Sequence, residues 1–548
     1  MSCSSSKSSA ARQASFKKGV DGDAARSRRQ QTTVQIRKQK REQGLAKRRN
    51  STVINNFVNA AEAPAAPGAE ASGSSSSSAM APTVENIPAL IAAVNAADGH
   101  MQTEGVRAFR KMLSVEQSPP VQAVIDCGVL PRLVSFLVPD ADPKTRFEAA
   151  GALTNIASTE HTEVVVRVGA VPGLVLCLMS PNADVREQCA WCLGNIAGDS
   201  PKLRDQVLAT PNAMRNLLAN VTQPASPSML RNAVWALSNF CRGKPQPDLQ
   251  VVGPCIPVLA AILNAVQDKE VLMDASWAIS YLSDGDDARI GAVVDSGAVP
   301  SLLKLLGHDA ASVITPALRS LGNIVSGNDK HTQCTVDNGG LLALLPLLTH
   351  SKKAIRKETC WALSNIAAGT QSQINALCAQ PQVIAGVVHQ LGNAEWDVKK
   401  EAAWVISNVA TGGTRDHVRT LIAQGALQPV CDLLIVEDAR IVTVALDALE
   451  AFLKSCQDTE VDIPTMIDEC DGIDKVEALQ SHENVEVYEK AVRLIETYFG
   501  GEDDEENEQI QPQVNAANNT FAFGAQPVAA VGGGGFDFGG QGGFNFNS

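Results

Sequence analysis

Trp361 and Asn365 lie four residues apart in the segment KETCWALSNIAAG (357–369). Side chains at this spacing share one face of an α-helix. An asparagine amide both donates and accepts hydrogen bonds, so it can bind the N–H and C=O groups of an extended peptide of any sequence. An indole ring attracts a lysine or arginine side chain, which contributes about 0.5–2 kcal/mol. The pair therefore indicates a surface that binds an extended, basic peptide.

The same pattern recurs along the chain, and the aligned segments start 40 to 44 residues apart. These segments are GALTN (151–155), WCLGN (191–195), WALSN (235–239), WAISY (277–281), RSLGN (319–323), WALSN (361–365) and WVISN (404–408). We call the first residue of each segment the ladder position. Three residues before it stand mostly polar side chains, namely Glu148, Gln188, Asn232, Asp274, Glu358 and Glu401, with Pro316 as the exception.

This polar, indole and amide pattern forms one stripe along a helix. A stripe that only filled the core would be apolar, and apolar residues such as Leu363 and Ile366 already supply the core positions beside Trp361. The stripe therefore favours binding over packing. Carboxylates at Asp199, Asp274, Glu358 and Glu401 would then pair with the charged ends of lysine and arginine side chains.

A helical repeat of about 42 residues is typical of the armadillo/HEAT class of stacked repeats. A second cassette precedes most ladder segments, as in GVLPRLVSFL (128–137), GAVPGLVLCL (169–178) and GAVPSLLKLL (297–306). Its glycine ends one helix and its proline begins the next. The sequence predicts an all-α, right-handed superhelical solenoid of about ten armadillo repeats over residues 84–499, whose first and last two repeats lack the pair, as capping repeats would.

The chain of 548 residues also separates its charges. Residues 1–50 hold 14 basic against 3 acidic residues, about +11, whereas the remainder carries about −24. We expect a disordered basic arm at 1–57, a flexible Pro/Gly/Ala/Ser linker at 58–83, and a disordered acidic and Gly/Phe-rich tail at 500–548. Opposite charges let the arm and the acidic body attract each other.

The arm itself contains AKRRN (46–50), which has the chemistry of the predicted ligand. Residues 51–83 tether it over an r.m.s. distance of about 30 Å, which gives an effective concentration of about millimolar. The arm is therefore predicted to compete with other basic peptides for the same surface.

Other function classes find little support in the sequence. The 13 cysteines are scattered, and no secretory signal or apolar run near 18 residues is present, which predicts a reduced, soluble, intracellular protein. Cys189 and Cys192 form one CxxC inside a helical pattern, where buried packing is expected rather than metal or redox chemistry. No HExxH, phosphate-binding loop or nucleophile elbow occurs, so we expect no enzyme, no cofactor and no metal.

These features together resemble the importin-α (karyopherin-α) family over nearly the whole chain, including the segment ALRSLGNIVSG around Arg319. The resemblance implies a nuclear import adaptor that binds nuclear localisation signals of cargo and links them to importin-β through its arm. It also implies shuttling between cytoplasm and nucleus through the nuclear pore, and export by a recycling exportin with Ran-GTP through the last repeat (462–499). Contact of the tail with nucleoporins is a further possibility, and no membrane or direct nucleic-acid contact is expected.

By resemblance, the family's sites are carried over to positions of this sequence. The major site comprises Asn155, Gln188, Trp191, Asn195, Asp199, Asn232, Trp235, Asn239, Asp274, Trp277 and Tyr281. The minor site comprises Arg319, Asn323, Glu358, Trp361, Asn365, Glu401, Trp404 and Asn408. The residues that bind importin-β and inhibit the site are Arg12, Lys17, Lys18, Arg28, Arg29, Arg37, Lys38, Lys40, Arg41, Lys47, Arg48 and Arg49.

Two ladder positions depart from tryptophan. Arg319 is expected to repel a lysine and so divide the two sites. Gly151 replaces the tryptophan that the family has at the first ladder position, so weaker binding is expected at that end of the major site, with heavier reliance on Trp191, Trp235 and the minor site.

The leading alternative is an armadillo scaffold of the β-catenin type in adhesion or signalling. Such grooves take acidic ligands with basic residues, whereas this ladder carries Asp and Glu beside Trp. Nucleic-acid binding by the arm is a further alternative, which the negative charge of the body disfavours.

Overall fold

The computed structural model describes residues 81–115, 118–456, 462–499, 513–515 and 520–522. The chain divides into two units, Met1–Lys475 and Val476–Ser548. The predicted arm at 1–57 and most of the predicted tail lie outside the described residues.

The described part of the first unit is helical. It begins with η1 (Val84–Asn86), α5 (Ile87–Val94) and α6 (Gly99–Leu113). From α7 onwards, a short first helix, a second helix and a long third helix follow one another repeatedly.

The first helices are α7 (Val121–Asp126), α10 (Thr162–Arg167), α13 (Pro201–Ala209), α16 (Leu249–Val252), α19 (Asp287–Asp295), α22 (Asp329–Asp337), α25 (Gln371–Cys378), α28 (Arg415–Ala423) and α31 (Ile463–Asp468). The second helices are α8 (Leu130–Ser135), α11 (Ala170–Cys177), α14 (Ala213–Thr222), α17 (Ile256–Ala265), α20 (Ala298–Leu305), α23 (Gly340–Leu344), α26 (Pro381–Asn393) and α29 (Leu427–Cys431). The third helices are α9 (Pro143–Ala157), α12 (Ala183–Asp199), α15 (Pro227–Cys241), α18 (Lys269–Leu282), α21 (Ala311–Ile324), α24 (Lys353–Ala367), α27 (Trp396–Gly412) and α30 (Ala439–Cys456). Short 3-10 segments adjoin some of these helices, namely η2 (Gly253–Cys255), η3 (Leu345–Thr349) and η4 (Asp432–Ile435).

The boundary between the units falls within α32 (Gly472–Ala478). The second unit continues with η5 (Leu479–Ser481), α33 (Val485–Tyr498), β1 (Gln513–Asn515) and β2 (Thr520–Ala522). β1 and β2 pair antiparallel, with Val514 opposite Phe521. The sequence analysis did not anticipate these strands within the predicted tail.

The glycines of the second cassette end the preceding helices as predicted. Gly128, Gly169 and Gly297 have φ angles of 74°, 82° and 75°. This left-handed conformation costs glycine little because it has no Cβ atom, and it closes a helix before the next one begins. The turn therefore lies at the same place in these repeats, which keeps their second and third helices in register.

Side-chain caps fix where several third helices begin. The side chain of Asn182 accepts the backbone N–H of Val185 at the start of α12, and Ser226 accepts that of Met229 at the start of α15. Such caps stabilise a helix by about 1 kcal/mol because they satisfy N–H groups that lack a partner within the helix. The caps thereby set the position of the ladder residues along each helix.

Each third helix packs against the third helix of the next repeat, in the series α6, α9, α12, α15, α18, α21, α24, α27 and α30. The core lies between them and the second helices, and Leu363 and Ile366 of α24 are fully buried there as expected. Cys189 and Cys192 of α12 are likewise buried in the core, and burial raises the pKa of the Cys192 thiol to about 12. A thiol with this pKa stays protonated at neutral pH, so the confirmed packing role accounts for the CxxC.

The predicted all-α repeat architecture is confirmed, whereas the number of ten repeats and the superhelical hand stay predictions. Within the ranges that the structure describes, no helix combines the length and the apolarity needed to cross a bilayer.

Candidate peptide-binding site

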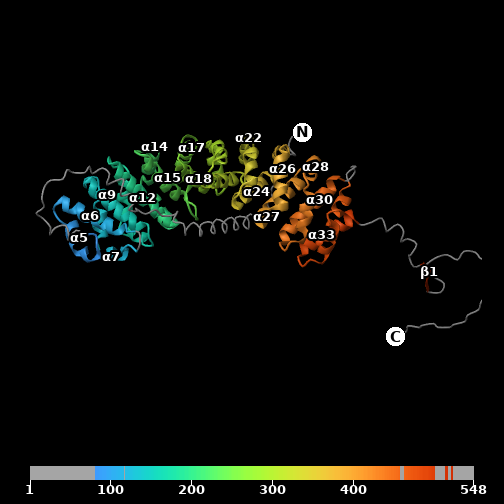
Figure 1. Cartoon of the computed structure of the whole chain (residues 1–548), viewed down its shortest axis with the longest axis horizontal. Coiled ribbons are helices and arrows are strands. Elements are labelled where there is room, and N and C mark those ends of the chain that lie inside the picture. Colours follow the sequence, from blue (N-terminus) through green and yellow to red (C-terminus); the bar gives the residue numbers. More distant parts are fainter. Residues whose placement is uncertain (1–80, 116–117, 457–461, 500–512, 516–519, 523–548) are drawn as a thin grey trace, which may run out of the picture. The chain divides into compact units, whose positions relative to one another are not determined.

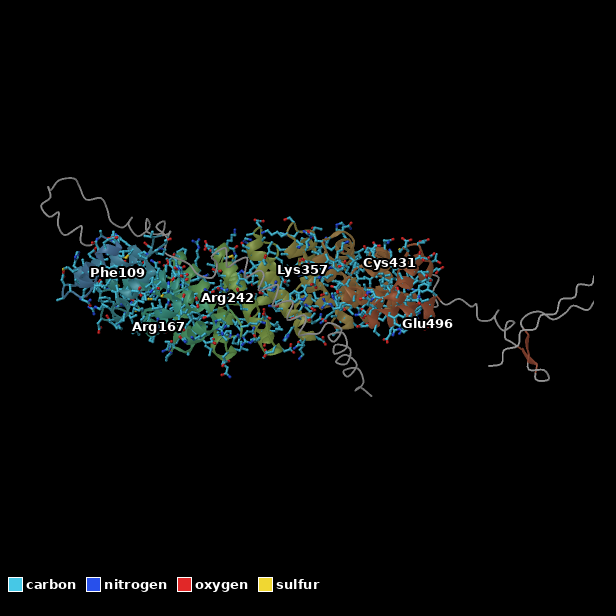
Figure 2. The ribbon with its side chains drawn as sticks, turned by 90° about the horizontal axis from the view of Figure 1, so that it is seen from below. Phe109, Arg167, Arg242, Lys357, Cys431 and Glu496 are labelled. Carbon is cyan, nitrogen blue, oxygen red and sulfur yellow. The ribbon has the colours of Figure 1, made fainter. Side chains whose placement is uncertain are left out.

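The third helices bring the ladder positions of successive repeats onto neighbouring helices. The predicted major-site residues lie on α9, α12, α15 and α18, and the minor-site residues on α21, α24 and α27. Because each helix packs directly on the next, residues that are about 42 positions apart in the sequence become neighbours. Figure 2 labels Phe109 on α6, at one end of this series, and Lys357 on α24, further along it.

Two indoles rest on glycines of the preceding third helix. A Cβ atom at Gly194 of α12 would lie 2.9 Å from Cε3 of Trp235 on α15. A Cβ atom at Gly322 of α21 would lie 2.7 Å from Cε3 of Trp361 on α24. Each ring therefore packs closely against a helix backbone that no larger residue could present. This contact fixes the indole between two adjacent helices.

The indoles differ in their exposure to solvent. Trp191 and Trp235 are buried in the complete chain, with 6% and 2% of their surface exposed, whereas Trp277, Trp361 and Trp404 are partly exposed. A row of indoles that receives a ligand is expected to be open to solvent, and in the complete chain Trp191 and Trp235 are not. Packing of the Trp235 ring against Gly194 contributes to its burial.

The asparagines four residues after the ladder position form a regular hydrogen-bonded row. Each Nδ2 donates to the backbone carbonyl three residues after the ladder position of the preceding third helix. The bonds run from Asn195 to Thr154 (3.2 Å), from Asn239 to Gly194 (3.0 Å), from Asn323 to Ser280 (3.0 Å) and from Asn408 to Ser364 (2.9 Å). The amides therefore hold neighbouring repeats together in addition to any role in binding.

The row extends to α6 and has one exception. Nδ2 of Asn155 donates to the carbonyl of Arg110 at 3.4 Å. Nδ2 of Asn365 is buried and has no hydrogen-bond partner within the described ranges. A buried amide N–H without a partner costs about 1–3 kcal/mol, and a carbonyl oxygen that accepted its hydrogen bond would remove this cost.

The remaining polar positions of the major site are held by their neighbours. Nε2 of Gln188 donates to Oγ1 of Thr154 at 2.8 Å, and Nδ2 of Asn232 donates to Oε1 of Glu187 at 2.9 Å. These bonds fix the side chains that come three residues before the indoles.

Trp277 and Tyr281 end the major site on α18. Their rings stack with centroids 5.8 Å apart and an interplanar angle of 22°. Among the predicted carboxylates, Asp274 is buried, Glu401 is half-buried and Asp199 is exposed. The carboxylates therefore differ in the environment that they offer a cation.

Arg319 forms a two-pronged ion pair with Glu358 of the next third helix. Its Nε and Nη2 atoms lie 2.8 Å and 2.6 Å from the two carboxylate oxygens. The expected repulsion of lysine by an isolated Arg319 therefore needs correction, because Glu358 compensates the charge. Arg319 therefore occupies the ladder position of α21 and also engages Glu358, the carboxylate three residues before the next ladder position.

A comparable pair lies beside Gly151 and was missed by the sequence analysis. Nε of Arg110 on α6 donates to Oε2 of Glu148 on α9, and Nε of Arg107 donates to Oε1 of the same carboxylate at 2.9 Å. Burial acts to lower the pKa of Arg107, but the hydrogen bonds and charges of Glu148 and Glu104 outweigh it, so this pKa is raised. Counting 44 residues back from Gly151, one of the observed spacings, would have found Arg107, and Arg110 follows it by one helical turn.

The basic residues predicted to bind importin-β, from Arg12 to Arg49, lie outside the described residues. The site described above therefore includes none of these residues, and their role stays a prediction.

Comparison with known proteins places the chain among importin-α subunits. A family profile described as importin beta binding domain matches residues 12–107. Profiles of the armadillo/beta-catenin-like repeat match residues 117–158, 158–198, 286–326 and 328–368, and a profile of an atypical Arm repeat matches residues 463–513.

Similar proteins cover nearly the whole chain. Importin subunit alpha-1b of Oryza sativa subsp. japonica is 47% identical, with 83% of this chain and 86% of that protein covered. Importin subunit alpha-2 of Arabidopsis thaliana is 46% identical, with 95% and 97% covered. The crystal structure of an engineered protein is 28% identical with a TM-score of 0.68, and covers 76% of this chain and 99% of its own. The chain therefore belongs to the importin-α family of armadillo-repeat adaptors of nuclear import.

Proposed function

We propose that the chain carries proteins into the nucleus by binding their Lys/Arg-rich localisation signals on the third helices, and that it joins importin-β through residues 1–57. This proposal rests on a pair of features repeated on consecutive third helices. An indole packs against a glycine of the preceding third helix, and an asparagine donates a hydrogen bond to a carbonyl of that helix. Family membership and the importin beta binding profile at 12–107 support the link to importin-β.

The geometry suggests how such a signal would be held. Each anchored amide has a further N–H and an acceptor oxygen, which in the proposed complex bind the main chain of the cargo peptide. Lysine and arginine side chains then lie along the indoles, and their cationic ends approach carboxylates such as Asp274 and Glu401. Because main-chain bonds ignore side-chain identity, the site selects an extended peptide for its charge rather than for one sequence.

We further propose that the arm inhibits the site until importin-β binds. The basic segment AKRRN (46–50), which has the chemistry of the cargo, and the opposite charges of arm and body support this proposal. Importin-β would fold the arm, withdraw Lys47, Arg48 and Arg49, and admit the cargo; after release in the nucleus, the arm would expel the cargo. The two states compete for one surface, which makes the coupling reciprocal.

The rest of the transport cycle is proposed from the family alone. It comprises shuttling between cytoplasm and nucleus, export with a recycling exportin and Ran-GTP through residues 462–499, and contact of the tail with nucleoporins. The proposal includes no enzymatic step, no cofactor and no contact with membrane or nucleic acid.

A comparison of basic and acidic peptides tests the proposed function against the β-catenin type of scaffold. We expect the full chain to bind a five-residue Lys/Arg peptide at least about tenfold more tightly than an Asp/Glu peptide of equal length, because the site carries carboxylates and indoles. Fluorescence anisotropy with labelled peptides measures both affinities. Tighter binding of the acidic peptide would contradict the import role and favour the scaffold.

A further inference from the structure

The chain contains the same arginine–glutamate arrangement at two places in the row of third helices. Arg319 occupies the ladder position of α21 and pairs with Glu358, which lies three residues before the ladder position of α24. Arg107 occupies the ladder position of α6, because Asn155 donates to the carbonyl of Arg110, just as the other asparagines donate to the carbonyl three residues after a ladder position. Arg107 pairs with Glu148, which lies three residues before the ladder position of α9.

Arg110 also fills the space that a residue at 151 would use. A Cβ atom at Gly151 would lie 2.6 Å from Cδ and 3.3 Å from Cγ of Arg110. The aliphatic stem of Arg110, which stands three residues after the ladder position of α6, therefore packs on Gly151. A tryptophan in place of Gly151 would have to displace Arg110, which explains why glycine stands there.

Both carboxylate oxygens of Glu148 are engaged within the chain. Arg110 holds Oε2 and Arg107 holds Oε1 at 2.9 Å. The side chains of Arg110 and Glu148 are only 9% and 6% exposed. A cargo cation could reach this carboxylate only by breaking a buried ion pair, which is costly because it leaves a buried charge uncompensated.

We propose that the pairing of Glu148 with Arg107 and Arg110 closes the major site at α9, as the Arg319–Glu358 pair closes it at α21. This inference rests on the proposed function. If both ends are closed, basic side chains of the cargo bind only beside Trp191, Trp235 and Trp277. The site therefore selects signals with a short basic core. A basic residue that extends past Trp191 toward α6 adds no affinity.

Neutralising single carboxylates tests this limit in the full chain. In the Glu148→Gln variant, we expect the affinity for a Lys/Arg peptide to stay within about twofold of wild type, because Glu148 does not meet the cargo. In the matched Asp274→Asn variant, we expect about tenfold weaker binding, since a charge-assisted contact is lost. Thermal melting of both variants verifies that they are folded.

Substituting the two arginines tests whether Glu148 fails to meet cargo because it is paired or because it lies too far from the peptide. With Arg107→Met and Arg110→Met together, Glu148 loses its partners and the slot opens, so adding Glu148→Gln to this background should weaken binding about threefold or more. If the double variant does not fold, the comparison of Glu148→Gln with Asp274→Asn decides alone.

The outcomes distinguish this inference from the proposed function. Equal losses in Glu148→Gln and Asp274→Asn would overturn the closure and leave the adaptor role intact. Unchanged binding in Asp274→Asn, together with unchanged binding in Trp235→Ala, would overturn the proposed site and the closure with it.

Discussion

Replacing Trp191 and Trp235 with alanine is expected to weaken the binding of a basic signal peptide to the full chain by about 100-fold. Each indole contributes a cation–π contact and an apolar wall for an aliphatic stem, together about 1–2 kcal/mol per ring. Two rings therefore account for about two orders of magnitude in the dissociation constant. Isothermal titration with a peptide that carries a single basic cluster measures this loss.

Trp396→Ala is the matched control for this experiment. Trp396 begins α27 and is 37% exposed, but it lies outside the predicted sites. We expect its substitution to leave peptide binding within about twofold of wild type. Trp235 packs on Gly194, so its loss also destabilises the array, and urea unfolding must show that the double variant is folded under the conditions of the titration. A folded double variant with unchanged affinity would contradict the binding surface.

Deleting residues 1–57 is expected to strengthen the binding of the same peptide by about 10- to 1,000-fold in the absence of importin-β. A tethered competitor at an effective concentration of about millimolar reduces the apparent affinity by the ratio of that concentration to its own dissociation constant. A micromolar to 100-micromolar self-interaction of the arm gives the stated range. Titration of both forms under identical salt measures the effect.

A substitution within the arm provides the control for this deletion. Lys47→Ala, Arg48→Ala and Arg49→Ala together keep the length of the arm but remove its cargo-like charges. This variant should recover most of the gain, because the competition depends on these side chains. Equal affinities of the full chain and the deletion would contradict autoinhibition, while leaving the binding surface itself untouched.

The repeat architecture could be predicted because its signals are local. Gly128, Gly169 and Gly297 mark helix ends by their backbone conformation alone, and the spacing of Trp and Asn within one helix follows from its periodicity. The identity of the third helices and their order followed directly. The short pairing of β1 with β2 had no comparable signal in the Gly/Phe-rich sequence.

The contacts between repeats could not be predicted in the same way. That the amide of Asn239 bonds to the carbonyl of Gly194 depends on how closely two helices approach. The burial of Trp235 follows from the same approach, since its ring packs against the backbone of Gly194. A small residue before each asparagine, such as Thr154, Gly194 or Gly322, was the available signal, and it went unused.

The role of Arg110 could not be predicted from the sequence for a different reason. The first repeat lacks the Trp/Asn pair, so it was interpreted as a cap and its residues were not aligned with the ladder. The importance of Arg110 comes from its partner Glu148 and from the space above Gly151, which only coordinates reveal. The binding surface on the third helices therefore stays a prediction from the sequence, whereas the ion pair at its end was found only in the structure.

A crystal structure of the chain with a bipartite basic signal peptide tests the central claim most directly. The account predicts an extended peptide along the third helices, with its main chain hydrogen-bonded to the amides of Asn195 and Asn239 and to those of Asn365 and Asn408. It also predicts lysine or arginine stems beside Trp235 and Trp361, and no cargo side chain at Glu148. A peptide bound on the first or second helices, or through the arm alone, would contradict it.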